Sequence, residues 1–468
     1  MRKFVLLLFF GLLSFSVFSG PVTIEEARRI AKNIYFERVQ QKMLMNMADI
    51  VITEEFVIDY AGDPAYYIFN IGKEHGFVIV AADDVVYPVL AYSFEGAYRT
   101  DNHHPSFRAQ MSLYERQIVE IRDDNPLPVA ELTEVWSKYN RDDFSATKDI
   151  ITIGPWCTTK WDQGLYYNDS TPGGSVTGCV ATAMAQVMKS FKHPKTGKGS
   201  HYYMHPYYGK QYANFGATTY DYSKMPDIVT SPNPNVAQLM YHCGVSVDMN
   251  YAPGGSGASM FSARDAFDMY FRYNFTAHVM TKNSVDDETW KILVRAELID
   301  GAPVMYSGPN HAFVCDGFHY PDHFHFNWGW GGSYNGYFYM TNLNPGYSNY
   351  TNGQDAILQL YPDPMDNAEM PGGKISLENN LVNRGVEITV LPNPVTDVMS
   401  IAVINDDEGD ALCSIIDLNG RVLKTFPFVK ISGMHLNEVP VDDIPDGLYL
   451  VTVKTDNKNL TTKCIVQR

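Results

Sequence analysis

The chain has 468 residues, of which 45% are hydrophobic, and carries a formal net charge of -17. This length suits two or three domains, and the 31 Tyr and 25 Phe favour packed sheets over a disordered polymer. The acidic charge is spread along the chain, which argues against a nucleic-acid partner. Composition therefore predicts a folded, multidomain, soluble protein.

The first residues predict export. The basic pair Arg2-Lys3 precedes the apolar run 4–13, and small residues follow at Ser19 and Gly20. This order is typical of a secretory signal peptide and is too short for a comfortable membrane span. We expect residues 1–20 to be a signal peptide, and we expect no transmembrane segment after it.

Six cysteines are too few and too scattered for a disulfide scaffold; they stand at positions 157, 179, 243, 315, 413 and 464. Cys413 and Cys464 share the last segment, so a disulfide between them is left open.

Residues 21–148 read as one α+β unit. Thr23 and Glu26 match a capping box that opens an amphipathic helix through about Met47. Turn residues separate three strand-like runs and predict an antiparallel sheet, with a further helix after it: strands at 56–60, 66–70 and 76–81, helix at 106–122. The polar stretch 140–148 is expected to be an exposed linker, where proteolytic nicks concentrate.

Residues 149–365 read as a second unit, which begins helical and ends as a sheet. A helix is expected from Ser284, as N-cap, to Asp300. Strand-like segments close the unit, at 302–307, 312–318, 323–328 and 336–341.

Residues 366–385 are expected to be a linker to a third unit, 386–468. Its strand-like runs, at 399–403, 413–417 and 448–453, and its turns at Asn419-Gly420 and Asp446-Gly447 predict a small β-sandwich. No catalytic constellation is evident there.

Cys179 is the candidate nucleophile. It follows a run of small and turn-forming residues and opens a helical stretch whose apolar residues recur on one face, at 180, 183, 184, 187 and 188. Unpaired N–H groups and the helix dipole favour a thiolate at a helix start. A small apolar cysteine in a core helix is the commoner alternative.

His311 is the candidate general acid/base. It heads a strand-like run directly after the loop 307–310, so its ring can project into a cleft while the sheet holds it. The separation from Cys179, 311 minus 179 or 132 residues, agrees with the roughly 130–150 residues of papain-like proteases. Spacing alone is also compatible with a structural histidine.

Two further residue sets complete the constellation. Asn327 can accept a hydrogen bond that orients the imidazole, with Trp328 and Trp330 shielding that bond from water. A glycine-rich hairpin with aromatic residues is the ordinary reading of this segment. Gln163 can donate a side-chain N–H to an oxyanion, with the Cys179 backbone N–H as second donor; a simple turn at Gln163-Gly164 is the alternative.

These segments together resemble the streptopain family of papain-like cysteine proteases. The resemblance lies in Gly178 to Ala183, in His311 to Val314 and in Asn327 to Gly332, and it extends to an inhibitory prodomain through 76–83 and 87–93. It covers the chain up to about residue 365. Cys315 departs from the aliphatic residue expected there and is taken as a buried small side chain.

The resemblance implies a secreted endopeptidase that is made as a zymogen, needs no cofactor or metal, acts on protein substrates and is inhibited by its own prodomain. Cys179 would be the nucleophile, His311 the acid/base and Gln163 the oxyanion donor. Either Asn327 or Trp328 would orient the histidine, and Asn327 is preferred. The substrate side would include Gly255, Ser256, Gly257, Ala258 and Trp330.

The last unit resembles the C-terminal sorting domain of type IX secretion substrates in Bacteroidetes. The resemblance lies in 391–394, 417–422, 447–451 and 463–466. It implies the type IX machinery as a partner and a secreted or outer-membrane location in a Gram-negative bacterium. A generic β-sandwich that binds carbohydrate or protein is the alternative.

Three rival functions remain open. A metal-dependent hydrolase could use His319, His323 and His325 beside Asp316 and Asp322, but the segment has no His-Glu-x-x-His or comparable ligand spacing, so surface histidines are favoured. A non-catalytic adhesin on the same fold is disfavoured by the complete constellation. Another Cys–His acyl-transfer enzyme, such as a transglutaminase or amidase, is not excluded by residue chemistry.

Overall fold

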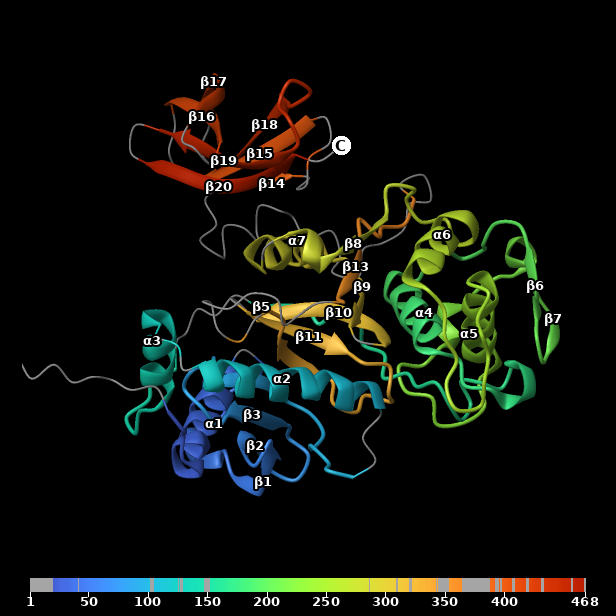
Figure 1. The fold of residues 1–468 in the computed structure, drawn as a ribbon. Helices are drawn as coiled ribbons and strands as arrows, with labels where there is room; N and C mark the ends of the chain where they lie inside the picture. The colour runs from blue at the N-terminus through green and yellow to red at the C-terminus, as the bar shows by residue number, and fades with distance from the viewer. Residues whose placement is uncertain are drawn as a thin grey trace, which may run out of the picture. The chain divides into compact units, whose positions relative to one another are not determined.

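The computed structural model describes residues 20–363 and 388–466, apart from short gaps at 41, 102–104, 125, 127–128, 147–151, 286, 309, 320–321, 342, 344–352, 392–394, 396–397, 406–408, 418–420, 431–432 and 456–457. Residues 1–19 of the expected signal peptide and the linker 366–385 lie outside the described residues. The chain divides into two compact units, residues 1–148 with 342–350 and residues 149–341 with 351–468. Figure 1 traces the elements along the chain.

The first unit is an antiparallel sheet covered by helices. Helix α1 (Ile24–Val39) opens with the predicted capping box, in which Thr23 and Glu26 exchange hydrogen bonds. The strands pair in the order β1 (Ile52–Tyr60), β2 (Asp63–Ile71), β3 (Phe77–Ala81) and β4 (Val89–Ser93). Helix α1 packs on β3, and α2 (Pro105–Asp124) packs on β2.

The first unit differs from the expectation at its helices α1 and α3, and its fourth strand, β4, was also not predicted. Helix α1 ends at Val39 rather than near Met47, and a single 3-10 turn, η1 (Met47–Asp49), follows later. Helix α3 (Ala130–Tyr139) was not predicted, although its Leu132, Trp136 and Tyr139 are buried at helical spacing. Ten residues gave too short a pattern to recognise.

The second unit begins with helices and ends as a sheet, as expected. Its strands pair in the order β12 (Gly336–Tyr339), β11 (His323–Asn327), β10 (His311–His319), β9 (Val304–Gly308), β13 (Asp355–Leu358) and β8 (His278–Thr281), with β5 (Thr152–Ile153) against β10. All nine residues of β10 are buried, so this strand is central.

Four helices accompany this sheet: α4 (Cys179–Phe191), α5 (Pro234–Ser246), α6 (Met260–Phe271) and α7 (Asp287–Ile299). Helix α4 packs on both β10 and α5. Figure 1 shows α4 and α5 side by side. Helix α7 starts three residues after the predicted N-cap Ser284, which instead ends the 3-10 turn η5 (Lys282–Ser284). The helices α5 and α6, the strand β13 and the hairpin of β6 (His201–His205) and β7 (Gly209–Ala213) were not predicted. Short 3-10 turns complete the unit: η2 (Pro172–Gly174), η3 (Phe215–Ala217) and η4 (Tyr222–Lys224).

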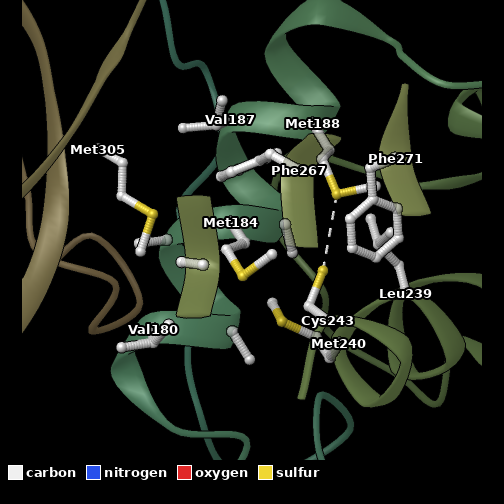
Figure 2. Close-up of a cluster of buried hydrophobic side chains, with 14 of the residues drawn as sticks. Val180, Met184, Val187, Met188, Leu239, Met240, Cys243, Phe267, Phe271 and Met305 are labelled. Atoms are coloured by element: carbon white, nitrogen blue, oxygen red, sulfur yellow. Dashed lines mark hydrogen bonds between the residues drawn. The ribbon is translucent and has the colours of Figure 1, made fainter. Parts of the chain in front are cut away.

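The core behind α4 is rich in sulfur. Figure 2 shows the apolar face of α4, with Val180, Met184 and Met188, pointing toward side chains of other segments such as Met240 and Met305. The thiol of Cys243 lies 3.6 Å from Met188 Sδ. Methionine fills irregular gaps because its side chain is unbranched and flexible. This packing anchors the helix that carries Cys179.

The third unit predicted from the sequence is a two-sheet structure with its own core. One sheet contains β14 (Ile388–Leu391), β15 (Val398–Asn405) and β18 (Gly433–Pro440), and the other β17 (Val422–Lys430), β16 (Gly409–Asp417), β19 (Gly447–Lys454) and β20 (Asn459–Val466). Buried side chains from both sheets form one apolar cluster, as in a β-sandwich. All six cysteines are free, and β19 separates the strands of Cys413 and Cys464.

Within the described ranges, no helix combines the length and the apolar character that crossing a bilayer requires.

Candidate active site

Glycine is required immediately before Cys179, the candidate nucleophile. Gly178, the N-cap of α4, has φ = 88°, a conformation that side-chain-bearing residues rarely adopt. A Cβ added there would lie 2.8 Å from Met249 Sδ and 2.9 Å from the backbone oxygen of Ser256. The close approach of these chains places Cys179 on the first turn of α4.

The thiol of Cys179 lies against the start of β10. Burial raises its pKa, and the backbone N–H groups of Ala312, Val180 and Cys179 itself oppose that increase. Interaction with the Ala312 N–H brings the sulfur next to the residue that follows His311. The backbone N–H groups at the helix start do favour the thiolate, but desolvation outweighs them, so the net pKa of the Cys179 thiol is raised. A neighbouring base that accepts the thiol proton would offset this increase in pKa.

His311 is held in a defined orientation. It is 5% exposed, follows Asn310 in a left-handed conformation (φ = 57°), and begins β10. Its Nε2 lies 2.9 Å from the backbone oxygen of Trp328, and its ring stacks on Trp330 with centroids 4.5 Å apart. Because a carbonyl oxygen only accepts, Nε2 carries the proton. Nδ1 is then the nitrogen that can take a proton from a thiol.

The preferred assignment of Asn327 as the hydrogen-bond partner of His311 is not what the structure contains. Asn327 Nδ2 donates to the backbone oxygen of Thr159 (2.6 Å), and Asn327 Oδ1 accepts from the Gly329 N–H (3.2 Å). The atom that His311 Nε2 contacts is the main-chain carbonyl oxygen of Trp328, the other residue considered for this position. The ring centroid of Trp328 lies 4.6 Å from that of Phe313 and 5.2 Å from that of Trp330, on which the indole stacks. The indole thus packs against its neighbours, as expected.

Gln163 carries a buried donor. Its side-chain Nε2 is shielded from solvent and has no hydrogen-bond partner among the described residues. Its backbone oxygen accepts from the Thr177 N–H at 3.0 Å, two residues before Cys179. Asp162 Oδ1 accepts from the Gln163 N–H at 2.6 Å. An unsatisfied buried donor is costly unless a ligand uses it, and the residue that carries this donor is bonded to the segment just before Cys179.

The glycine-rich loop is tied to the same segment. Ser256 Oγ donates to the backbone oxygen of Val176 (2.6 Å) and accepts from the Ala252 N–H (3.0 Å). Gly255 and Gly257 are exposed, and a Cβ at either would meet open space. Ala258 is half-buried beside the core. Of the expected substrate-side residues, Ser256 uses its hydroxyl to anchor the loop, and Trp330 lies against His311.

The histidines of the rival metal site are buried, not on the surface as expected. His325 Nδ1 pairs with Asp316 Oδ1 at 2.5 Å, His319 stacks on Tyr337, and Asp322 pairs with Lys291. Among the described residues, no group of three or more His, Cys, Asp or Glu could hold a metal ion. Cys315 is fully buried, and burial holds the pKa of its thiol well above the ordinary value.

The groups missed from the sequence are mostly backbone atoms: the Ala312 N–H and the Trp328 carbonyl. They carry no residue signature, because every residue has them. Asn335 was also missed; its Oδ1 accepts from the Trp328 N–H at 3.0 Å. Its position in a glycine-rich loop offered no signal beyond a turn residue.

A thiol on the first turn of a buried helix, packed against a strand that begins with a histidine, defines a papain-like fold with a cysteine–histidine site. The family model described as the Peptidase C10 family matches residues 161–338, the Spi protease inhibitor model matches residues 19–118, and a secretion system C-terminal sorting domain model matches residues 389–467. The chain belongs to the Peptidase C10 family.

Relatives support the same grouping. The thiol protease/hemagglutinin PrtT of Porphyromonas gingivalis is 30% identical over 80% of this chain, which covers 46% of that protein. Streptopain of Streptococcus pyogenes is 29% identical over 63% of this chain and 80% of its own. A prointerpain A fragment of Prevotella intermedia is 33% identical, with a TM-score of 0.54 over 66% of this chain and all of that one. The chain thus spans about half of PrtT but all of the interpain fragment.

Proposed function

We propose that this protein is a secreted cysteine endopeptidase in which Cys179 is the nucleophile and His311 the general acid/base. The observation that carries the proposal is the bond from His311 Nε2 to the Trp328 carbonyl oxygen. It directs the basic nitrogen, Nδ1, away from that carbonyl, while the Ala312 N–H holds the thiol beside the same strand. Nucleophile and base are thus supplied by two elements that pack together, α4 and β10.

The reaction follows from these positions. His311 Nδ1 takes the thiol proton as the sulfur of Cys179 attacks the peptide carbonyl carbon. Negative charge develops on the carbonyl oxygen, where Gln163 Nε2 and the Cys179 N–H donate. The imidazolium gives its proton to the leaving amine as the C–N bond breaks, which leaves a thioester. Water, deprotonated by His311, then hydrolyses the thioester, and the thiol regains its proton.

The protein is made as a zymogen in this proposal. The match of residues 19–118 to a protease-inhibitor model supports an inhibitory role for the first unit. Cleavage between the two units would release the mature enzyme. Protein and peptide segments are the substrates, and the loop around Gly255 and Gly257 is their docking side.

The match to a sorting-domain model supports the proposed location of the protein. Type IX sorting tails direct proteins out of the cell, so the protein is secreted or held at the cell surface. We propose that residues 386–468 are the segment recognised by the secretion machinery. Retention at the outer membrane belongs to the same proposal.

The test is intact mass after incubation of the processed protein with a thiol-directed peptide epoxide. We expect one adduct, located on Cys179, together with loss of casein hydrolysis. The variant Cys179→Ala should take no adduct, cleave no casein and stay unprocessed. Casein cleavage by purified Cys179→Ala would overturn the mechanism. Labelling of Cys179 without any peptide hydrolysis would instead indicate another Cys–His acyl-transfer reaction.

A further inference from the structure

Gln186 lies two turns after the nucleophile on the same face of α4. Cys179, Thr182 and Gln186 are spaced by three and four residues, which places them in one stripe of the helix. This stripe meets the chain around Gly329, where an added Cβ would lie 3.0 Å from Thr182 Cγ2 and 3.8 Å from Gln186 Nε2. The apolar face of Figure 2 is a different one, with Val180, Met184 and Met188.

Gln186 is expected to lower the stability of the folded protein at this position. Its side chain is fully buried, and its Nε2 has no hydrogen-bond partner among the described residues. An amide buried with an unpaired donor is less stable than an apolar side chain of similar size. Because the Gln186 amide does not stabilise the fold, its presence is better explained by a role in function.

The side-chain oxygen of Gln186 is bonded to Thr159, and Thr159 connects Gln186 to the site of His311. Gln186 Oε1 accepts from Thr159 Oγ1 at 2.8 Å, and the backbone oxygen of Thr159 accepts from Asn327 Nδ2 at 2.6 Å. Asn327 in turn holds the Gly329 N–H, and the same peptide unit presents the carbonyl oxygen that binds His311. Every hydrogen bond in this series is buried.

We propose that Gln186 is a positioning residue for the peptidase reaction. By holding Thr159, it fixes the distance between the helix that carries Cys179 and the peptide unit that orients His311. The inference rests on the proposed function, because it assigns Gln186 to the same thiol–imidazole site. Gln186 itself contacts neither the substrate nor the reacting atoms.

The test compares Gln186→Met with Ser190→Ala in the full-length chain after processing in trans by tagged wild-type enzyme, which is then removed. Ser190 is the matched control: it lies one turn further along α4, and its Oγ bonds the Gln186 backbone oxygen (3.0 Å) and Cys157 Sγ (2.9 Å), away from Thr159. Three quantities are measured on each protein: kcat and KM on a fluorogenic peptide, Tm, and the pH midpoint of Cys179 alkylation by iodoacetamide.

For Gln186→Met we expect kcat to fall about tenfold with KM within about twofold, because a misplaced base slows chemistry more than binding. The alkylation midpoint should move to higher pH, since the imidazole stabilises the thiolate less well. Tm should be unchanged or higher. Ser190→Ala should keep the wild-type kcat and midpoint. A kcat loss equal to that of Ser190→Ala, or one that falls in step with Tm at an unchanged midpoint, would overturn the inference.

Thr159→Val removes the donor of the same hydrogen bond. This variant keeps the inference testable if Gln186→Met does not fold. It should lower kcat by a similar factor, and the double variant should be no slower than either single one, because both remove one interaction. Additive losses would contradict the shared role. A wild-type protein that neither hydrolyses peptide nor alkylates at Cys179 would refute the proposed function itself, which is a separate result.

Discussion

Asn327 and His311 bind opposite ends of one peptide unit. Asn327 Oδ1 accepts from the N–H of Gly329, and the carbonyl oxygen of that unit, on Trp328, meets His311 Nε2. The side-chain amide thus acts on the imidazole through a backbone peptide, which aligned hydrogen bonds polarise cooperatively. The predicted direct hydrogen bond between Asn327 and His311 is absent, and Asn327 bonds the peptide unit whose carbonyl oxygen meets the imidazole.

Replacing Asn327 tests this arrangement. Asn327→Ala removes the bonds to both Thr159 and Gly329, so the carbonyl that orients His311 loses its support. We expect kcat to fall roughly 100-fold with little change in KM. Asn327→Asp should fall as far, because a carboxylate oxygen would face the Thr159 carbonyl. Steady-state kinetics with Tm measured in parallel checks this; a kcat within twofold of wild type in Asn327→Ala would refute it.

Gln163 should matter mainly in the transition state. Gln163→Ala deletes a buried donor, and we expect kcat to drop about 100- to 1000-fold with KM within about twofold. Gln211→Ala is a matched control, because that buried amide donates to the Tyr208 oxygen (3.1 Å) in the β6–β7 hairpin. Equal effects of the two variants on kcat would remove Gln163 from the oxyanion site.

Ser256 should affect substrate binding more than chemistry. Ser256→Ala frees the glycine-rich loop from Val176, and the loss of one hydrogen bond, about 1 kcal/mol, corresponds to a roughly fivefold increase in KM. Ser246→Ala, which loses a bond within its own helix to Cys243, should leave KM unchanged. Peptide titration of both variants decides the matter, and an unchanged KM in Ser256→Ala would count against the loop assignment.

Glu297 makes stability depend on pH. Burial raises the pKa of Glu297 to about 7 and that of nearby Asp300 to about 6. A carboxyl whose folded pKa is raised stabilises fully below its unfolded pKa, and this stabilisation is lost as pH increases through the folded value. Tm should therefore fall between about pH 5 and 8. Glu297→Gln should flatten that fall and be the more stable protein at pH 8, by on the order of 3 kcal/mol at most. Parallel Tm–pH curves would contradict it.

The first processing cut should lie after Asp142. Asn33 Nδ2 donates to the backbone oxygens of Tyr139 and Arg141, both at 2.8 Å, and Arg29 binds Asn140 and Asp142. A protease needs an extended, accessible chain, and these bonds hold residues 139–142 against α1. We expect cleavage within about 140–155, because the linker predicted from the sequence begins this range, and these bonds place the mature N-terminus after residue 142.

Asn33→Ala should permit additional cuts between 139 and 142, while Lys32→Ala on the same helix should not. N-terminal sequencing of the processed forms reads out both. A wild-type mature form that begins before residue 120 would contradict processing in this linker.

Local patterns were strong enough to predict several parts of the molecule. The capping box of Thr23 and Glu26, the helix start at Cys179, the strand headed by His311 and the alternation of the C-terminal strands each depend on residues close in sequence. The free state of Cys413 and Cys464 could not be predicted, because it depends on which strands are neighbours. The buried histidines were mistaken for surface residues for the same reason: Asp316 and Tyr337 pack on them across the sheet.

The sequence alone determined the residue types of the site, since a thiol after glycine, a histidine at a strand start and a nearby amide have distinctive spacing. The tertiary structure alone decided how they act. Backbone groups of Ala312 and Trp328 hold the sulfur and the imidazole. Burial raises the pKa of the Cys179 thiol by more than the N–H groups at the helix start lower it. Backbone donors and acceptors are the same in every residue, and desolvation depends on the whole packed surroundings, so only the folded chain specifies them.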